Sequence, residues 1–182
     1  MRVVVAVTAA SGAIYARQCV DLLLGVAAVE RIALIYSREA EAVAKAEGVV
    51  MPEDSRIEIY RNDDMWASPA SGSARWDAML VVPSTMGTIA RIASGVSQTL
   101  IERAADVMLK ERRRLVIVAR EAPYSLIHLR NMTTLTEAGA IIIPASPSFY
   151  FQPQSIEELC LTISQRAVEL LGVELCHREW GE

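Results

Sequence analysis

Two turns of the chain carry small residues and hydroxyl groups directly after an apolar run. The first is Thr8-Ala9-Ala10-Ser11-Gly12 and the second is Pro83-Ser84-Thr85-Met86-Gly87-Thr88. Hydroxyl groups and the unpaired amides at the start of a following helix can hold a phosphate group. A serine in such a turn is also a common helix N-cap, so either turn alone is weak evidence for a ligand site. Two such turns at one edge of a sheet favour a mononucleotide.

Charged residues follow in the second half of the chain. Arg103 and Lys110 lie seven residues apart in a predicted helix over residues 101–111, so they share one face of it. Arg120 and Glu121 follow a predicted strand, at the end where open α/β sheets bind ligands. A solvated basic stripe is the alternative for Arg103 and Lys110. Cations beside apolar residues at this edge favour an anionic substrate.

Alternating strands and helices would position these residues. The predicted strands cover residues 2–7, 31–36, 77–82, 115–119 and 140–143, and the predicted helices end near residues 24, 47, 111, 137 and 171. Residues 48–75 break the pattern and predict a loop that either contributes to the ligand site or only connects two elements. The pattern predicts a single-domain α/β fold: a doubly wound, Rossmann-like or flavodoxin-like, mostly parallel sheet flanked by helices.

Composition and charge exclude several classes of protein. The chain has 182 residues, 52% of them apolar, which is enough for one domain with one core. The formal net charge is −4 at pH 7 and no long basic face is present, so we expect no nucleic-acid partner. The apolar runs are far shorter than the roughly 20 residues of a membrane helix, and no cleavage site follows the first residues. We therefore expect no membrane association and a soluble, cytoplasmic protein.

Cysteine and histidine are too few and too widely spaced for a metal site or a disulfide framework. Cys19, Cys160 and Cys176 form no Cys-x-x-Cys pair, and neither His128 nor His177 has a partner at ligand spacing. We expect free thiols and no bound metal.

Several longer motifs resemble those of the UbiX flavin prenyltransferases. They are residues 70–73, 100–113, 120–123, 128–129, 131–132, 147–155 and 180–181. The resemblance covers nearly the whole chain. It implies transfer of a dimethylallyl group from dimethylallyl phosphate to reduced FMN, at N5 and C6 and without a metal ion, to make prenylated FMN for a UbiD-type decarboxylase. It also implies a homo-oligomer, a dodecamer with sites shared between subunits, in which the C-terminal helix and tail over residues 155–182 pack at subunit contacts.

The resemblance also implies roles for individual residues. FMN would be held by Ala9, Ala10, Ser11, Ser37, Thr85, Met86, Gly87, Thr88 and Arg103. The phosphate of the donor would be bound by Lys110, Arg120, Tyr150 and Arg166, which we call the donor set. The catalytic residues would be Glu121, Glu47 and Ser11, with Glu121 as the proton donor to the departing phosphate and Glu47 as an acid-base group for ring closure. Salt bridges are the alternative for the glutamates, and packing or solvation for Tyr150 and Arg166.

Three positions depart from the family pattern. Ala9 stands where a glycine is usual, so its Cβ could obstruct the flavin or require a turn with negative φ. Ser84 replaces a frequent cysteine, which should matter little because both side chains are small. Phe151 replaces a histidine of many members, so this position cannot supply a catalytic histidine here.

Two other functions stay open on the sequence alone. One is a flavin-dependent cysteine decarboxylase, which would need a site for a peptidyl or pantothenoyl cysteine. The other is an FMN-binding carrier without turnover, which Ala9 favours. The donor set favours a phosphate-bearing substrate and therefore the transferase, with either the monophosphate or the diphosphate as the donor.

Overall fold

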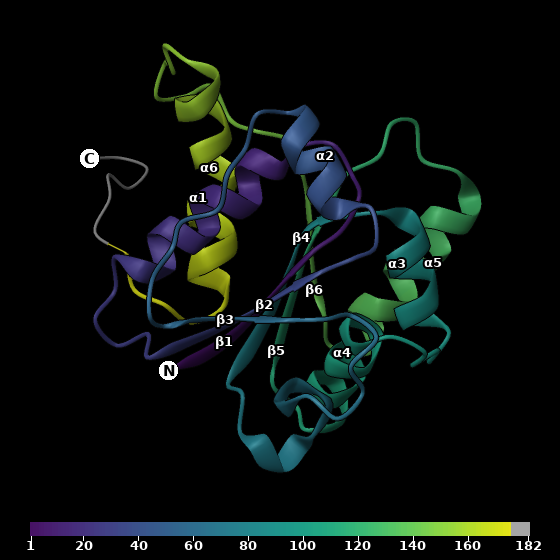
Figure 1. Ribbon diagram of the computed structural model, residues 1–182. Coiled ribbons are helices and arrows are strands. Elements are labelled where there is room, and N and C mark those ends of the chain that lie inside the picture. The colour runs from purple at the N-terminus through teal and green to yellow at the C-terminus, as the bar shows by residue number, and fades with distance from the viewer. Residues whose placement is uncertain (176–182) are drawn as a thin grey trace.

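The computed structural model describes residues 1–175, and six strands form its sheet. The strand order is β3-β2-β1-β4-β5-β6 and every neighbouring pair is parallel (Figure 1). The strands are β1 (Arg2–Val7), β2 (Arg31–Tyr36), β3 (Ile57–Tyr60), β4 (Ala78–Ser84), β5 (Arg114–Ala119) and β6 (Ile141–Pro144). The predicted motif at 180–181, Cys176 and the end of the predicted contact segment 155–182 lie outside the described residues.

Helices connect the strands and cover both faces of the sheet (Figure 1). They are α1 (Ala13–Leu24), α2 (Ala40–Ala46), α3 (Met86–Ala93), α4 (Leu100–Lys110), α5 (Leu126–Glu137) and α6 (Ile156–Leu170). Two short 3-10 helices, η1 (Ser68–Ala70) and η2 (Gly72–Ala74), precede β4. Within residues 1–175, no helix is both long enough and apolar enough to cross a membrane.

The alternation of side chains along β1 divides the core into two layers. Val3, Val5 and Val7 pack on the face that α1 and α6 cover. Val4 and Ala6 point to the opposite face, where they pack with residues of α3, α4 and α5. All five side chains are at most 1% exposed, as expected for a parallel strand that is buried on both faces.

The prediction of an α/β fold with a parallel sheet is confirmed, but the sheet has six strands rather than five. The additional strand, β3, lies inside residues 48–75, which the sequence predicts as a loop. β3 has only four residues and lies at the edge of the sheet, where Ile59 is 69% exposed. A short edge strand lacks the continuous apolar run that marks the central strands, so the sequence pattern does not reveal it.

Candidate functional site

The carboxyl ends of β1 and β4 meet where the strand order reverses. After β1 the chain passes to α1 on one face of the sheet, and after β4 it passes to α3 on the other (Figure 1). Thr8 connects the two ends, because its Oγ1 donates to the Pro83 carbonyl at 2.8 Å and accepts from the Thr85 amide at 2.8 Å. Open α/β sheets bind ligands in the crevice at such a switch point.

A cavity of about 360 Å³ opens at this point, and we call it the switch-point cavity. Four of the residues predicted to bind FMN line it, namely Ala9, Ser37, Thr85 and Thr88. The other lining residues are Arg38, Glu39, Asn62, Arg91, Gln98, Thr99 and Glu102. A second cavity of about 560 Å³ lies toward β3 and adjoins it through shared lining residues such as Ser37 and Asn62. The fold therefore gathers four of the nine predicted FMN-binding residues from separate turns around one cavity.

The first turn of α3 presents hydroxyl groups and amides at this cavity. Thr85 caps the helix, because its Oγ1 accepts from the Thr88 amide at 3.2 Å, and the two hydroxyl oxygens lie 3.0 Å apart. Met86 is buried, whereas Gly87 is exposed. Amides in the first turn of a helix have no partner within the helix and carry partial positive charge. This turn is suited to holding a phosphate group.

Arg91 and Glu102 also line the cavity, and neither is among the site residues predicted from the sequence. The Glu102 side chain is 2% exposed, and its Oε2 accepts from the amides of Gln98 and Thr99 at 2.9 and 3.0 Å. Its Oε1 accepts from Nε of Arg91. The spacing of Thr99 and Glu102 is that of a capping box, a sequence signal that could have located the carboxylate. No sequence signal pairs this carboxylate with Arg91.

Ser11 and Glu47 meet at the start of α1. The Glu47 carboxylate accepts from the Gly12 amide at 2.9 Å and from the Ala13 amide at 2.7 Å. Burial alone would raise the pKa of Glu47, but these two amides, the Ser11 hydroxyl and the charge of Arg120 lower it overall. Glu47 is therefore ionised at neutral pH. In this structure the amides of Gly12 and Ala13 donate to the Glu47 carboxylate, and the predicted role of this turn in binding FMN stays a prediction.

Ala9 fits its turn without backbone strain. Among the described residues, only three that are not glycine have positive φ, and Ala9 is not one of them. Glycine is required instead at Gly12, where φ is +101° and an added Cβ would lie 2.9 Å from Cδ2 of Tyr15. Ala10 is buried beneath the turn at 2% exposure. Ala9 therefore lines the switch-point cavity in a conformation that any residue can adopt.

Arg120 and Glu121 leave the carboxyl end of β5, beside the end of β4. The Arg120 amide donates to the Ser84 carbonyl at 3.1 Å. Its Nε is buried and has no hydrogen-bond partner among the described residues. Oε1 of Glu121 accepts from the Ala122 amide at 3.0 Å. These two residues therefore lie at the same edge of the sheet as the switch-point cavity, as the sequence predicts.

Two predicted cations lie on α4, away from this cavity. Arg103 donates to the Ala70 carbonyl at 3.0 Å and pairs with Asp106 at 2.6 Å. Lys110 ends α4 beside η2 and the start of β5, at the amino edge of the sheet. The six residues of β5 separate Lys110 from Arg120, a span of roughly 20 Å. Within one chain these two members of the donor set do not meet at one phosphate.

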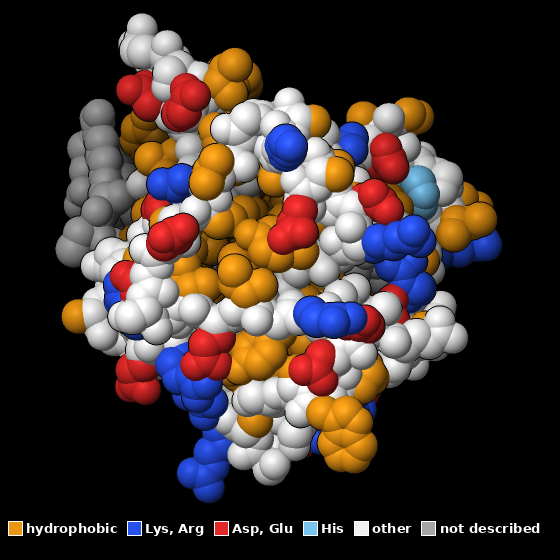
Figure 2. All heavy atoms as spheres, in the orientation of Figure 1, with side chains coloured by type: hydrophobic (Ala, Val, Ile, Leu, Met, Phe, Trp, Pro, Cys, Tyr) orange, Lys and Arg blue, Asp and Glu red, His pale blue; other side chains and the backbone are white. Residues whose placement is uncertain are grey.

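The other two members of the donor set are on the surface. Tyr150 is 73% exposed in the loop before α6, and the Arg166 side chain is 62% exposed on α6. Phe149, Phe151 and Ile156, near Tyr150, are also exposed. Figure 2 shows further apolar side chains at the surface over α5. Large exposed apolar side chains at each of these two places favour surfaces that a partner covers.

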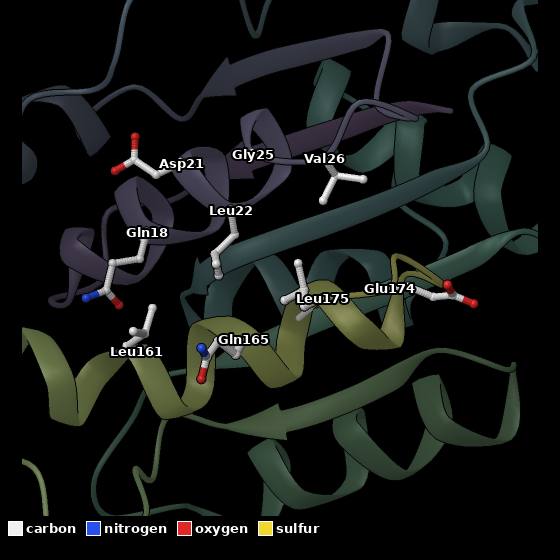
Figure 3. Close-up of a pocket in the computed structure, with 9 residues that line it drawn as sticks. All are labelled: Gln18, Asp21, Leu22, Gly25, Val26, Leu161, Gln165, Glu174 and Leu175. Carbon is white, nitrogen blue, oxygen red and sulfur yellow. The ribbon is translucent and has the colours of Figure 1, made fainter. Parts of the chain in front are cut away.

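A wider cavity of about 620 Å³ lies between α1 and α6, away from the switch point (Figure 3). Leu22 and Leu161 contribute to its apolar lining, and Asp21 and Glu174 lie at its edge. None of the described residues that line it is a lysine or an arginine. Acidic and apolar groups do not attract a phosphate, so the smaller switch-point cavity is the better candidate despite its size.

Among the described residues, cysteine chemistry gives no second candidate. Cys19 and Cys160 are free and buried, and burial raises the pKa of Cys19 to about 12. Such a thiol stays protonated and unreactive. In the part of the chain that the structure describes, no group of three His, Cys, Asp or Glu side chains could hold a metal ion.

Comparison with known proteins places the chain in a family. The flavoprotein family matches residues 1–167. The flavin prenyltransferase UbiX of Archaeoglobus fulgidus is 42% identical over 186 residues, which cover 100% of both chains. The crystal structure of AnUbiX (PadA1) in complex with FMN and dimethylallyl pyrophosphate is 43% identical, with 98% of each chain covered and a TM-score of 0.89. A dodecameric FMN-dependent UbiX-like decarboxylase from Escherichia coli O157:H7 is 33% identical over 100% of both chains, with a TM-score of 0.91. The chain therefore belongs to the flavoprotein family and, within it, to the UbiX flavin prenyltransferases.

Proposed function

We propose that this chain transfers a dimethylallyl group from dimethylallyl phosphate to reduced FMN. The observation that carries the proposal is the switch-point cavity, which unites Ala9, Ser37, Thr85 and Thr88 in a chain that belongs to the flavin prenyltransferases. These are residues that the family resemblance assigns to FMN. FMN, bound in its reduced form, would supply the nucleophile, and the product would carry new bonds to the prenyl group at N5 and C6.

The residues around the cavity fit a mononucleotide. Thr85, Thr88 and the first turn of α3 offer hydroxyl and amide donors for a terminal phosphate. The first turn after β1, with Ala9 and Ser11, lies next to them across the switch point. A flavin placed with its phosphate at α3 would bring its ring toward Ser11, Glu47 and Arg120. We infer this orientation from the positions of the charged and hydroxyl groups.

The chain's own acids would move the protons. Glu47 is held by the amides of Gly12 and Ala13 and is ionised, so it suits the role of a base beside Ser11. Glu121 lies at the carboxyl end of β5, next to Arg120, where it could protonate a departing phosphate. Cations of the donor set would stabilise the charge that develops as the C–O bond of the donor breaks. The inorganic phosphate would leave as the prenyl group is transferred.

The donor site requires more than one subunit in this proposal. Lys110 and Arg120 lie at opposite ends of β5, roughly 20 Å apart. One phosphate can contact both only if they come from different copies of the chain. The exposed apolar side chains before α6 and on α5 support such contacts. We propose a homododecamer, because the similar Escherichia coli protein is dodecameric.

The product would pass to a decarboxylase. We propose that prenylated FMN made here serves a UbiD-type enzyme, and that the protein works in the cytoplasm. Both statements rest on the family resemblance and on the sequence pattern.

Mass spectrometry of the flavin tests the function directly. The protein is incubated with reduced FMN and dimethylallyl monophosphate or diphosphate, and the flavin is then extracted. We expect a flavin heavier than FMN by one prenyl group. Unchanged FMN with both donors would contradict the transferase and leave an FMN-binding carrier. Decarboxylation of a cysteine-containing peptide or of a pantothenoyl cysteine, without any change in the flavin, would instead indicate the cysteine decarboxylase.

A further inference from the structure

The side chain of Arg91 bends back over the first turn of α3, toward the switch-point cavity. Its Nη2 donates to Oγ1 of Thr88 at 3.3 Å. Its Nη1 would lie only 3.4 Å from a Cβ added at Gly87, so the guanidinium covers that turn closely. The Arg91 side chain is 48% exposed and lines the cavity. A cation therefore stands beside the hydroxyl and amide donors that suit a phosphate.

Glu102 fixes this orientation of the guanidinium. The carboxylate is 2% exposed, and a buried carboxylate is stable only when it is paired and hydrogen-bonded. Its Oε2 is satisfied by the amides of Gln98 and Thr99, and its Oε1 by Nε of Arg91. The carboxylate thus holds one edge of Arg91. The Nη groups keep further N–H donors for a ligand, because a guanidinium has five.

Arg91 and Glu102 are buried to different extents. Here only the carboxylate is buried, while about half of the Arg91 side chain faces the cavity and solvent. Arginine also presents its donors in a planar fork that matches two oxygens of a phosphate. The exposed side of Arg91 can therefore donate to a phosphate in the switch-point cavity.

We infer that Arg91 binds the phosphate of FMN in this chain and that Glu102 is its positioning residue. The inference rests on the proposed function and names the group that recognises the mononucleotide end of the cofactor. Arg91 would close the phosphate site from the side opposite Thr85, with Thr88 between them. FMN and riboflavin should then differ in affinity because of this one side chain.

Titration of Arg91→Met with FMN and with riboflavin tests the inference. Riboflavin has the same ring and ribityl chain but no phosphate, so a lost phosphate contact affects FMN alone. We expect the FMN affinity to fall about 10- to 100-fold, which corresponds to about 1.4 to 2.7 kcal/mol. The riboflavin affinity should change less than about 2-fold, since no charge-assisted bond is lost. Arg61→Met is the matched control, because Arg61 is exposed at 82%, pairs with Asp63 and lines the adjoining cavity.

Glu102→Gln separates positioning from folding. Glutamine keeps the shape and can still accept an amide hydrogen, but it no longer holds Arg91 by charge. We expect FMN to bind about 3- to 10-fold more weakly and riboflavin to bind as before. Thermal unfolding of the flavin-free protein should be recorded for each variant. If a variant has a lower melting temperature but the same ratio of FMN to riboflavin affinity as the wild type, the ion pair of Arg91 and Glu102 only supports the fold.

Two outcomes would overturn the inference, and they are distinguishable. If Arg91→Met weakens FMN and riboflavin equally, or neither of them, Arg91 does not contact the phosphate. If the wild-type protein binds neither flavin, the proposed function fails, and the inference fails with it. We expect the wild-type protein to bind FMN and both Arg91→Met and Glu102→Gln to bind it more weakly. Arg61→Met should bind FMN as tightly as the wild type does.

Discussion

The switch-point cavity and the donor set differ in how completely one chain assembles them. The cavity brings Ala9, Ser37 and Thr85 together from three strand ends of one sheet. The residues of the donor set lie far apart. Lys110 is near the amino end of β5, and Arg120 follows its carboxyl end. A site built from strand ends is fixed by the topology of a single fold. In the proposed function, a site built from exposed side chains on distant helices and loops would become complete only when copies of the chain associate.

The same difference separates binding of the flavin from transfer to it. Changes at the cavity should alter flavin affinity and the stability of the fold, even in an isolated subunit. Changes in the donor set and at Glu121 should leave the flavin bound and stop the transfer.

Glu121→Gln should retain FMN but lose most prenylation. In the wild type, Oε1 of Glu121 accepts from the Ala122 amide. Glutamine has the same shape and keeps this acceptor oxygen, but it cannot deliver a proton. Proton transfer by a positioned group contributes ~10²- to 10⁴-fold, or about 3 to 5.5 kcal/mol of barrier. Single-turnover rates with dimethylallyl phosphate measure the loss, and an FMN titration checks the pocket. Glu137→Gln, at the end of α5, is the control. A nearly wild-type rate would make Glu121 a structural residue, and Glu47 would be tested next.

Thr8→Val should destabilise the fold where β1 and β4 meet. Valine has the shape of threonine, but it leaves the Thr85 amide without the Oγ1 acceptor and removes a bond to the Pro83 carbonyl. A buried donor that loses its partner costs about 1 to 2 kcal/mol. Urea denaturation measures the free energy of unfolding, and the exposed Thr133→Val should change it little. Equal stability of Thr8→Val and wild type would show that this connection does not support the cavity.

Glu47→Gln should reduce stability in a pH-dependent manner. The folded protein lowers the pKa of Glu47 below its ordinary value of 4.5, so the ionised form stabilises the fold. The contribution is present above pH 4.5 and is lost as the pH falls through the folded pKa. An exposed carboxylate at a helix N-terminus contributes about 0.3 to 1 kcal/mol, and salt screens it. At pH 7 the free energies of unfolding of the wild type and Glu47→Gln should differ by about this amount, as measured by denaturation. The difference should shrink toward pH 3. Glu53→Gln, at another exposed glutamate, is the control, and a pH-independent difference for Glu47→Gln would contradict this role of Glu47.

Much of the fold could be predicted from the sequence because buried parallel strands carry a strong signal. The predicted strands at residues 2–7 and 31–36 coincide with β1 and β2. β4 continues through Pro83 to Ser84, beyond the predicted end at residue 82. β3 was missed because four residues at a sheet edge, half of them polar or exposed, resemble a loop. Sequence patterns thus report burial well and strand pairing at edges poorly.

The candidate site could be predicted only in part. The turns with Ala9 and Thr85 were located because a strand end followed by small and hydroxyl residues is a local pattern. The contact of Glu47 with Gly12 joins residues 35 positions apart, and no local pattern encodes it. Arg91 was missed for the same reason, since its partner lies on another helix. The roles of the donor set stay predictions, because they depend on contacts between copies of the chain.

Subunit complementation tests the shared donor site most directly. Lys110→Ala and Arg120→Ala would each be prepared alone and also assembled together from an equal mixture of the two variant chains. Each variant alone should lack prenylation, because every site loses one cation. If the two cations come from different subunits, random mixing leaves both in about a quarter of the sites of a symmetric oligomer. We expect about this fraction of wild-type activity to return in the mixture. Activity that stays at the level of the separate variants would contradict a site shared between subunits.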